Sequence, residues 1–216
     1  MNNSSNVLAK KMLIASSLVG LTILVANNAN ASVSEIIDGA RAYVGAGVGY
    51  NHYGVHGEFK KIVENNYKGS VKTSSTNLLL PLLGVKFKDN FGIEFGYQFH
   101  NKLKISGNNS GSLRIRNAFV DIMGYMPVGT SNFDLLGGLG MGRMNMAGKG
   151  ASGKAALGGD DYDKFGLRIK LGGQYSFDNS SWSVRGLVGH QQVGSKNNKR
   201  AIRNMQFAGV DVVYLI

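Results

Sequence analysis

The chain has 216 residues, a formal net charge of +11 and 43% hydrophobic residues, and it contains 31 glycines, 2 prolines and no cysteine. The lack of cysteine excludes disulfides, thiolate nucleophiles and cysteine-ligated metals. Beyond the amino-terminal segment, no apolar run reaches the roughly 18 residues that a membrane-spanning helix needs. The length suits a single domain.

The amino-terminal segment has the composition of a secretory signal peptide. Lys10 and Lys11 precede an apolar run, Met12–Ala26, which leads into Ala29-Asn30-Ala31, the small-x-small pattern that signal peptidase reads. We expect a signal peptide over residues 1–31, cleaved after Ala31, and one mature domain over residues 32–216. An uncleaved membrane anchor is the alternative, but the run of about 15 residues is shorter than the roughly 20 of a spanning helix.

Eight segments of the mature chain predict β-strands, because apolar residues alternate along them with small or polar ones. In chain order they are Ala42–Tyr50, Asn77–Phe87, Phe91–His100, Leu113–Met126, Phe133–Met144, Lys164–Phe177, Trp182–Val193 and Ile202–Ile216. The second contains Pro81, which cannot donate a ladder hydrogen bond. A β-bulge, or a strand that begins later, would accommodate this proline.

The alternation is clearest in Phe91–Phe99 and in Phe165–Phe177. One face of each segment is large and apolar, whereas the other mixes glycine with charged residues such as Glu94, Arg168 and Lys170. A soluble sandwich would bury the apolar face in a shared core. The small and charged face instead fits the inside of a narrow barrel, and the apolar face fits a surface in contact with lipid.

The predicted connections alternate between short and long. The short ones are Lys88–Asn90, Pro127–Asn132 and Asp178–Ser181, and the long ones are Asn51–Thr76, Asn101–Ser112, Ala147–Asp163 and Gly194–Ala201. Bacterial outer-membrane barrels place short turns in the periplasm and long loops outside the cell. The pattern therefore predicts an all-β fold, an antiparallel, eight-stranded, up-and-down transmembrane β-barrel with four long external loops.

Aromatic residues gather near both ends of the predicted strands. Near the short turns are Phe87, Phe91, Tyr125, Phe133, Phe177 and Trp182, and near the long loops are Tyr50, Phe99 and Phe165. Membrane barrels carry one aromatic belt at each water–lipid interface. The shared placement of these residues favours the same geometry.

The chain resembles the opacity-type and outer-membrane-protein-A-like small β-barrels of Gram-negative bacteria. The resembling segments are DNFGIEFGYQF, NAFVDIMGYMPV, FDLLGGLGMGR, FGLRIKLGGQYSF and FAGVDVVYLI. The resemblance is one of pattern and concerns the fold. It implies an outer-membrane location with loops at the cell surface, and roles in adhesion, host-factor binding or envelope structure. The family usually ends in an aromatic residue that the insertion machinery reads, whereas this chain ends in Ile216, so the effect of that residue on insertion stays open.

Charged side chains fall inside the predicted barrel once the apolar residues are assigned outward. The inward charges are Glu94, Asp121, Arg168, Lys170, Arg185 and Asp211. An eight-stranded barrel has room only for side chains, and isolated buried charges are costly, so we expect these groups to form ion pairs. Their pairing depends on a shear that the pattern does not reveal. A plugged, salt-bridged lumen is the main interpretation, and a gated ion path is the alternative.

We expect no catalytic residue, metal site or cofactor, and no enzymatic activity. Outer-membrane hydrolases pair a histidine with serine and an acid, but nothing selects a meeting of His100 with Ser106 over an ordinary rim histidine. His52 and His56 have the spacing of helical metal ligands, but the glycine-broken segment around them favours a loop. The glycine pairs do not stand between a strand and a helix, so no nucleotide site is indicated.

The predicted external loops are rich in basic residues. The candidate ligand-binding residues are Lys60, Lys61, Lys68, Lys72, Lys102, Lys104, Lys196, Lys199 and Arg200. Positive charge at a cell surface attracts polyanions such as lipopolysaccharide phosphates, sulfated glycans and acidic host proteins.

These residues predict a monomeric surface antigen of the outer membrane, an adhesin that binds host glycans, serum proteins or extracellular-matrix proteins. We expect it to contact outer-membrane lipid and lipopolysaccharide, and not to bind nucleic acid. The alternatives are an envelope-structural barrel without a specific ligand, a narrow porin-like channel and a lipid-active enzyme. The sequence identifies neither the ligand nor whether the lumen conducts ions.

Overall fold

The computed structural model describes residues 40–87, 90–107, 111–150, 153–154, 157, 162–193 and 202–216. The predicted signal peptide lies outside the described residues, as do the candidate ligand-binding residues Lys196, Lys199 and Arg200. Within the described ranges, no helix has the length and apolar character that a membrane crossing requires.

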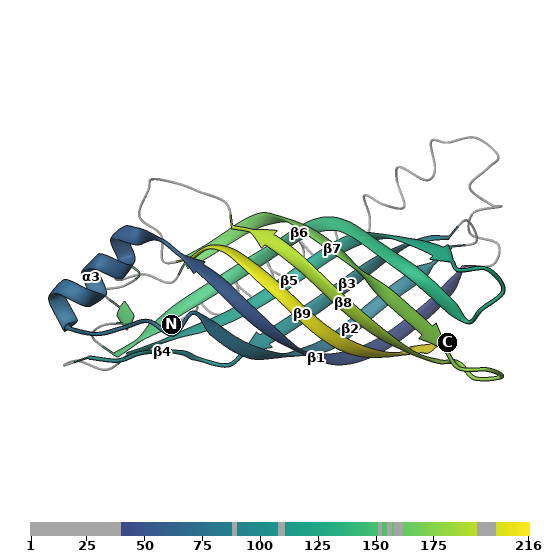
Figure 1. The fold of residues 1–216 in the computed structure, drawn as a ribbon, viewed down its shortest axis with the longest axis horizontal. Coiled ribbons are helices and arrows are strands. Elements are labelled where there is room, and N and C mark those ends of the chain that lie inside the picture. The colour runs from purple at the N-terminus through teal and green to yellow at the C-terminus, as the bar shows by residue number, and fades with distance from the viewer. Residues whose placement is uncertain are drawn as a thin grey trace, which may run out of the picture. The chain divides into compact units, whose positions relative to one another are not determined.

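Antiparallel strands make up most of the described chain (Figure 1). They are β1 (Arg41–Val55), β2 (Ser74–Lys86), β3 (Phe91–His100), β4 (Leu103–Ile105), β5 (Gly111–Pro127), β6 (Phe133–Lys149), β7 (Tyr162–Ser176), β8 (Trp182–Gln192) and β9 (Ile202–Leu215). The order around the sheet is β3-β2-β1-β9-β8-β7-β6-β5-β4, and a further pairing of β3 with β5 closes it. Since the short β4 pairs with no named strand but β5, the other strands form the closed eight-stranded barrel, which confirms the predicted fold.

Several strands extend further toward the long connections than the alternation predicts. β1 continues to Val55 rather than ending at Tyr50, and β6 continues to Lys149 rather than Met144. Along these extensions Tyr53 and Met146 point inward and are buried, as is the polar Asn51. The two apolar side chains belong to a buried cluster that also contains apolar residues from other segments: Tyr53, Phe59, Val63, Leu103, Ile105, Leu113, Ile115, Met144, Met146, Val193, Ile202, Met205 and Phe207.

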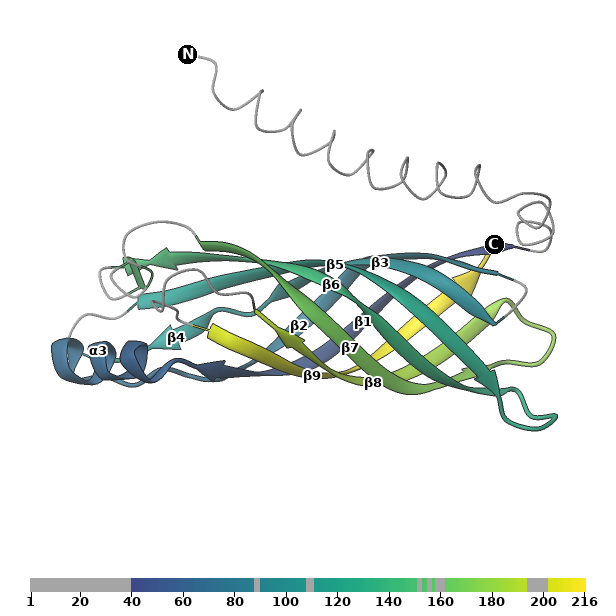
Figure 2. The same cartoon turned by 90° about the horizontal axis from the view of Figure 1, so that it is seen from above.

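The first long connection is a structured element and not the loop that the sequence favours. Helix α3 (Gly57–Tyr67) follows β1, and both views place it with β4 at one end of the barrel (Figures 1 and 2). Phe59 and Val63 lie one helical turn apart, and they are 3% and 1% exposed in the apolar cluster. The helix is therefore stabilised by covering an apolar barrel end.

Pro81 lies inside β2, at an irregularity in the strand pairing. On the β3 side, Leu79 pairs with Gln98 and Leu82 pairs with Gly96, so Leu80 and Pro81 have no partner in the ladder. The β1 pairing shifts at the same place. Because Pro81 lies in this bulge, no ladder hydrogen bond requires the amide hydrogen that proline lacks. A bulge is the first of the two arrangements expected for this residue.

The outward side chains form an apolar band around the barrel wall. Leu139, Leu167 and Val48 are 62%, 64% and 63% exposed, as expected of side chains that face lipid. Exposed aromatics lie near both ends of the band: Tyr175, Phe177, Trp182 and Tyr214 near the short turns, and Tyr50, Phe99 and Phe165 near the long connections. Tyr125 does not join the belt as predicted. It is 5% exposed and points inward, with its hydroxyl 3.2 Å from that of Tyr43.

Candidate functional site

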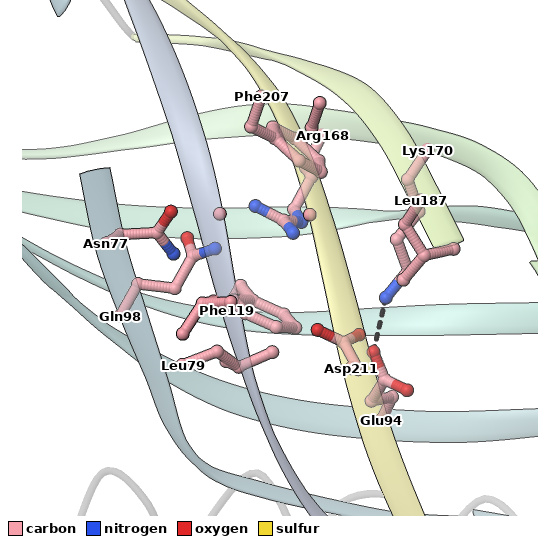
Figure 3. A pocket seen from close by; sticks show the side chains of 14 residues that line it. Asn77, Leu79, Glu94, Gln98, Phe119, Arg168, Lys170, Leu187, Phe207 and Asp211 are labelled. Carbon is pink, nitrogen blue, oxygen red and sulfur yellow. Dashed lines mark hydrogen bonds and ion pairs between the residues drawn. The ribbon is translucent and has the colours of Figure 1, made fainter. Parts of the chain in front are cut away.

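Six charged side chains form a continuous chain of ion pairs inside the barrel. Arg168 Nε donates to Asp121 at 3.0 Å, and Lys170 Nζ lies 2.8 Å from the same carboxylate. Lys170 also donates to Glu94 (Figure 3). Arg185 donates to Glu94 at 2.6 Å and to Asp211 at 3.0 Å. Each of the six is at most 4% exposed, and the charges alternate in the order Arg168, Asp121, Lys170, Glu94, Arg185 and Asp211.

The strand register explains how cations reach acids on distant strands. Glu94 and Asp121 are direct partners on β3 and β5, so two carboxylates lie side by side. Lys170 comes from β7, so β6 lies between it and Asp121, and both β6 and β5 lie between it and Glu94. Its direct partner on β6 is Gly138. A Cβ at the next inward position, Gly140, would collide with the Val120 backbone and the Asp121 carboxylate. Inward glycines of β6 thus leave the space through which the β7 cations cross the lumen.

Uncharged polar side chains fill the lumen between the ion pairs and the apolar end. Asn117 donates to Gln98 and to Gln191, both at 2.9 Å, and Asn51 donates to Asn77 at 2.8 Å. A void of about 20 Å³, lined by Asn77, Gln98 and four of the six charged residues among others, lies in this region (Figure 3). It has room for about one water molecule. This packing suits a plugged barrel.

The structure does not pair His100 with Ser106, the contact considered in the sequence. The Nδ1 atom of His100 lies 2.6 Å from the hydroxyl of Tyr53, whereas Ser106 pairs with Ser70, the two hydroxyl oxygens being 2.9 Å apart. His100 is also 7% exposed, so it is shielded from the lipid face. Among the described residues, no group of three or more His, Asp or Glu side chains is placed to hold a metal ion.

The described lysines among the candidate ligand-binding residues gather at the α3 end of the barrel. Lys60 and Lys61 lie on α3, Lys68 follows it, and all three are exposed. Lys72 and Lys104 are exposed on neighbouring segments, joined by a 3.0 Å backbone hydrogen bond from Lys72 N to Lys104 O.

One of these lysines is partly neutralised. Lys60 lies 3.7 Å from Glu64, one turn further along α3. Within the described part of the chain, Lys61, Lys68, Lys72, Lys102 and Lys104 form no ion pair. Among the residues that the structure describes, these five lysines therefore present positive charge without a carboxylate partner.

Sequence reasoning missed two features of the loop end. The first is the apolar seal by Phe59 and Val63, whose only signal is their i,i+4 spacing in GEFKKIVENNY. The second is that Arg143 on β6 joins Arg114 and Arg116 on the outward face of β5; the sequence shows the latter two only as basic residues at the start of a predicted strand. Their signal is their parity, because they share the outward face of their strands with the apolar band.

Comparison with known proteins assigns the family. The signature of the outer membrane protein beta-barrel domain matches residues 16–214, so the chain belongs to that family, and the resemblance drawn from the sequence is confirmed. Membership of the family implies an outer-membrane location. No match is found among curated proteins.

Solved structures show the same fold. Ail, the attachment invasion locus protein of Yersinia pestis, was crystallised with the heparin analogue sucrose octasulfate and superimposes with a TM-score of 0.53. It is 10% identical over 82% of this chain and 99% of its own. The outer membrane protein OprG of Pseudomonas aeruginosa gives a TM-score of 0.50 and 16% identity over 82% of this chain and 95% of its own. At these identities the likeness concerns the fold alone.

Proposed function

We propose that the protein is a non-enzymatic adhesin, a surface antigen that binds sulfated glycans through lysines at its loop end. The observation that carries this proposal is the group of exposed lysines without a carboxylate partner among the described residues: Lys61, Lys68, Lys72, Lys102 and Lys104. Such a group attracts polyanions over distances of several ångströms. The heparin analogue bound to Ail, a protein of the same fold, supports a sulfated ligand. A cleaved signal peptide over residues 1–31 belongs to this proposal.

The elements that carry these lysines support binding with little loss of entropy. Helix α3 is anchored in the apolar cluster by Phe59 and Val63, and the Lys72 and Lys104 segments are hydrogen-bonded to each other. A binding surface whose backbone is already ordered loses less conformational entropy on association than a flexible loop does. The ligand then meets a preformed array of cations.

Replacing Lys61, Lys68 and Lys72 together by glutamine is expected to weaken heparin binding at least about tenfold near 0.1 M salt, because three charges that attract the polyanion are lost. Surface plasmon resonance with the refolded barrel measures this affinity. The control is Arg41→Gln, an exposed residue at the first position of β1, next to Lys86 in the pairing with β2. Equal heparin affinity of the triple variant and the control would contradict the proposal. If the wild-type barrel binds serum or matrix proteins but not heparin, the ligand is a protein and not a sulfated glycan.

An envelope-structural barrel without a specific ligand is the second candidate. The filled lumen and the apolar seal at the α3 end favour it, because both stabilise a barrel irrespective of any ligand. Exchange of the Asn51–Thr76 segment for that of an unrelated small barrel separates the two functions. Loss of cell adhesion with normal assembly supports the adhesin, whereas unchanged adhesion supports the structural barrel.

A further inference from the structure

The outer wall of β5 changes from apolar to basic between neighbouring outward positions. Ile122 is 63% exposed in the apolar band, and Val120 and Ala118 continue its face. The next two outward residues toward the loop end are Arg116 and Arg114. The band on this strand therefore ends between Ala118 and Arg116.

The same change occurs on β6. Leu139 and Met141 are 62% and 56% exposed, and the next outward residue is Arg143. Arg143 pairs with Ala118 across the β5–β6 ladder, while Arg116 pairs with Asn145. The two arginines are thus diagonal neighbours, about 7–8 Å apart at the backbone. Arg114 lies two residues from Arg116 on the same face, about 7 Å away.

Exposed aromatic rings place these arginines at the membrane interface. Arg116 pairs with Phe99, which is 44% exposed. Arg143 pairs with Phe165, and its guanidinium carbon lies 5.6 Å from the ring centroid. Outward aromatic residues of membrane barrels sit at the level of lipid headgroups. The three guanidinium groups accordingly lie where the acyl chains end.

One of the three charges is already compensated. Arg143 Nε donates to both carboxylate oxygens of Asp163, at 2.8 and 3.0 Å. Arg114 and Arg116 form no ion pair with any described carboxylate. By contrast, Lys86 near the short turns lies 3.4 Å from Asp134. Among the described side chains, Arg114 and Arg116 therefore add positive charge at headgroup depth that no ion pair balances.

We propose that Arg114 and Arg116, with Arg143 beside them, bind a phosphate of the lipopolysaccharide headgroup in the outer leaflet. Guanidinium groups bind phosphate through paired, charge-assisted hydrogen bonds. The position of these arginines at the edge of the apolar band favours a lipid as the ligand. The acyl chains of such a lipid cover Ala118 and Val120, and its phosphate contacts Arg116. The site uses residues other than the glycan-binding lysines, so it stands apart from the proposed adhesin activity.

The test measures lipid retained by the refolded barrel in phosphatidylcholine nanodiscs that contain bisphosphorylated or dephosphorylated lipid A. Native mass spectrometry counts lipid A molecules per barrel. We expect wild-type protein to retain the bisphosphorylated form preferentially. In the Arg114→Gln/Arg116→Gln variant this preference should fall by about tenfold, because one or two charge-assisted hydrogen bonds to phosphate are lost. Asp163→Asn should increase retention, because it frees Arg143 from its carboxylate.

Matched variants separate this site from the glycan surface. The control Lys60→Gln/Lys61→Gln, on α3, should retain lipid A as wild type does, and the arginine variant should keep its heparin affinity. Heat-modifiable migration on gels verifies that each variant is folded. Equal retention of bisphosphorylated and dephosphorylated lipid A by the wild type would overturn the proposal, as would equal retention by the wild type and the folded arginine variant.

Discussion

Replacing Arg185 by alanine is expected to lower the free energy of unfolding of the refolded barrel by about 3–5 kcal/mol. Arg185 is the common partner of Glu94 and Asp211, and its removal leaves Asp211 without a cation and Glu94 with Lys170 alone. Glu94 is 1% exposed and Asp211 is 4% exposed, so water cannot replace the lost guanidinium. Urea unfolding in lipid vesicles, followed by Trp182 fluorescence, measures the change.

Two further variants make this prediction specific. Arg203→Ala, at an exposed position of β9, should change stability by less than about 0.5 kcal/mol. The double variant Arg185→Ala/Asp211→Ala should cost less than the sum of its single changes, because the second change removes an acid that the first left unpaired. An Arg185 variant of unchanged stability that conducts ions in planar bilayers would replace the plugged lumen with a channel.

Replacing Ile169 by arginine is expected to destabilise the barrel by about 2–4 kcal/mol, the cost of a cation facing lipid near the bilayer midplane. Ile169 is 51% exposed on β7 and lies between the exposed Leu167 and Leu171. The same urea titration in vesicles measures the loss, and unfolding of the vesicle-bound barrel at lower urea is the expected sign.

The matched control is Asn66→Arg, which adds the same charge at an exposed position of α3. This change should leave stability within about 0.5 kcal/mol of the wild type, because the side chain reaches water. If the barrel tolerates arginine equally at both positions, Ile169 does not face lipid.

The number and direction of the eight barrel strands could be predicted because one physical pattern runs through all of them, whereas the short β4 lies in a connection that was predicted to be a loop. Within the bilayer, most apolar residues face lipid, and the narrow lumen holds small side chains, paired polar side chains and some apolar ones such as Leu82 and Phe119. Phe91–His100 shows both requirements in one segment, and its observed bounds are the predicted ones.

The inward orientation of apolar residues near the long connections was not predicted, because the apolar and polar faces of a strand exchange where the wall leaves the membrane. Along β5 the inward positions change from Asp121 and Asn117 to Ile115 and Leu113, while the outward positions change from Ile122 to arginine. Beyond the bilayer, water is outside and the apolar core is inside, as in a soluble sheet. A rule that assigns every apolar residue outward therefore fails at this point of the strand.

The charged residues of the lumen could be assigned to the interior, but their connections could not be predicted. Lys170 contacts Asp121 from two strands away, which depends on the shear and on the space left by Gly140. Helix α3 was missed for a related reason. A helix of 11 residues is marginal by itself, and packing of Phe59 and Val63 on the barrel end stabilises it.

The orientation of the barrel underlies both binding proposals, and the absence of natural cysteine allows a direct measurement of it. Asn66→Cys places one thiol on α3, and Thr130→Cys places one in the short turn between β5 and β6. A membrane-impermeant maleimide applied to intact cells should label Asn66→Cys, and it should label Thr130→Cys only after the outer membrane is permeabilised. Labelling of Thr130→Cys but not Asn66→Cys in intact cells would contradict an outward-facing α3 end.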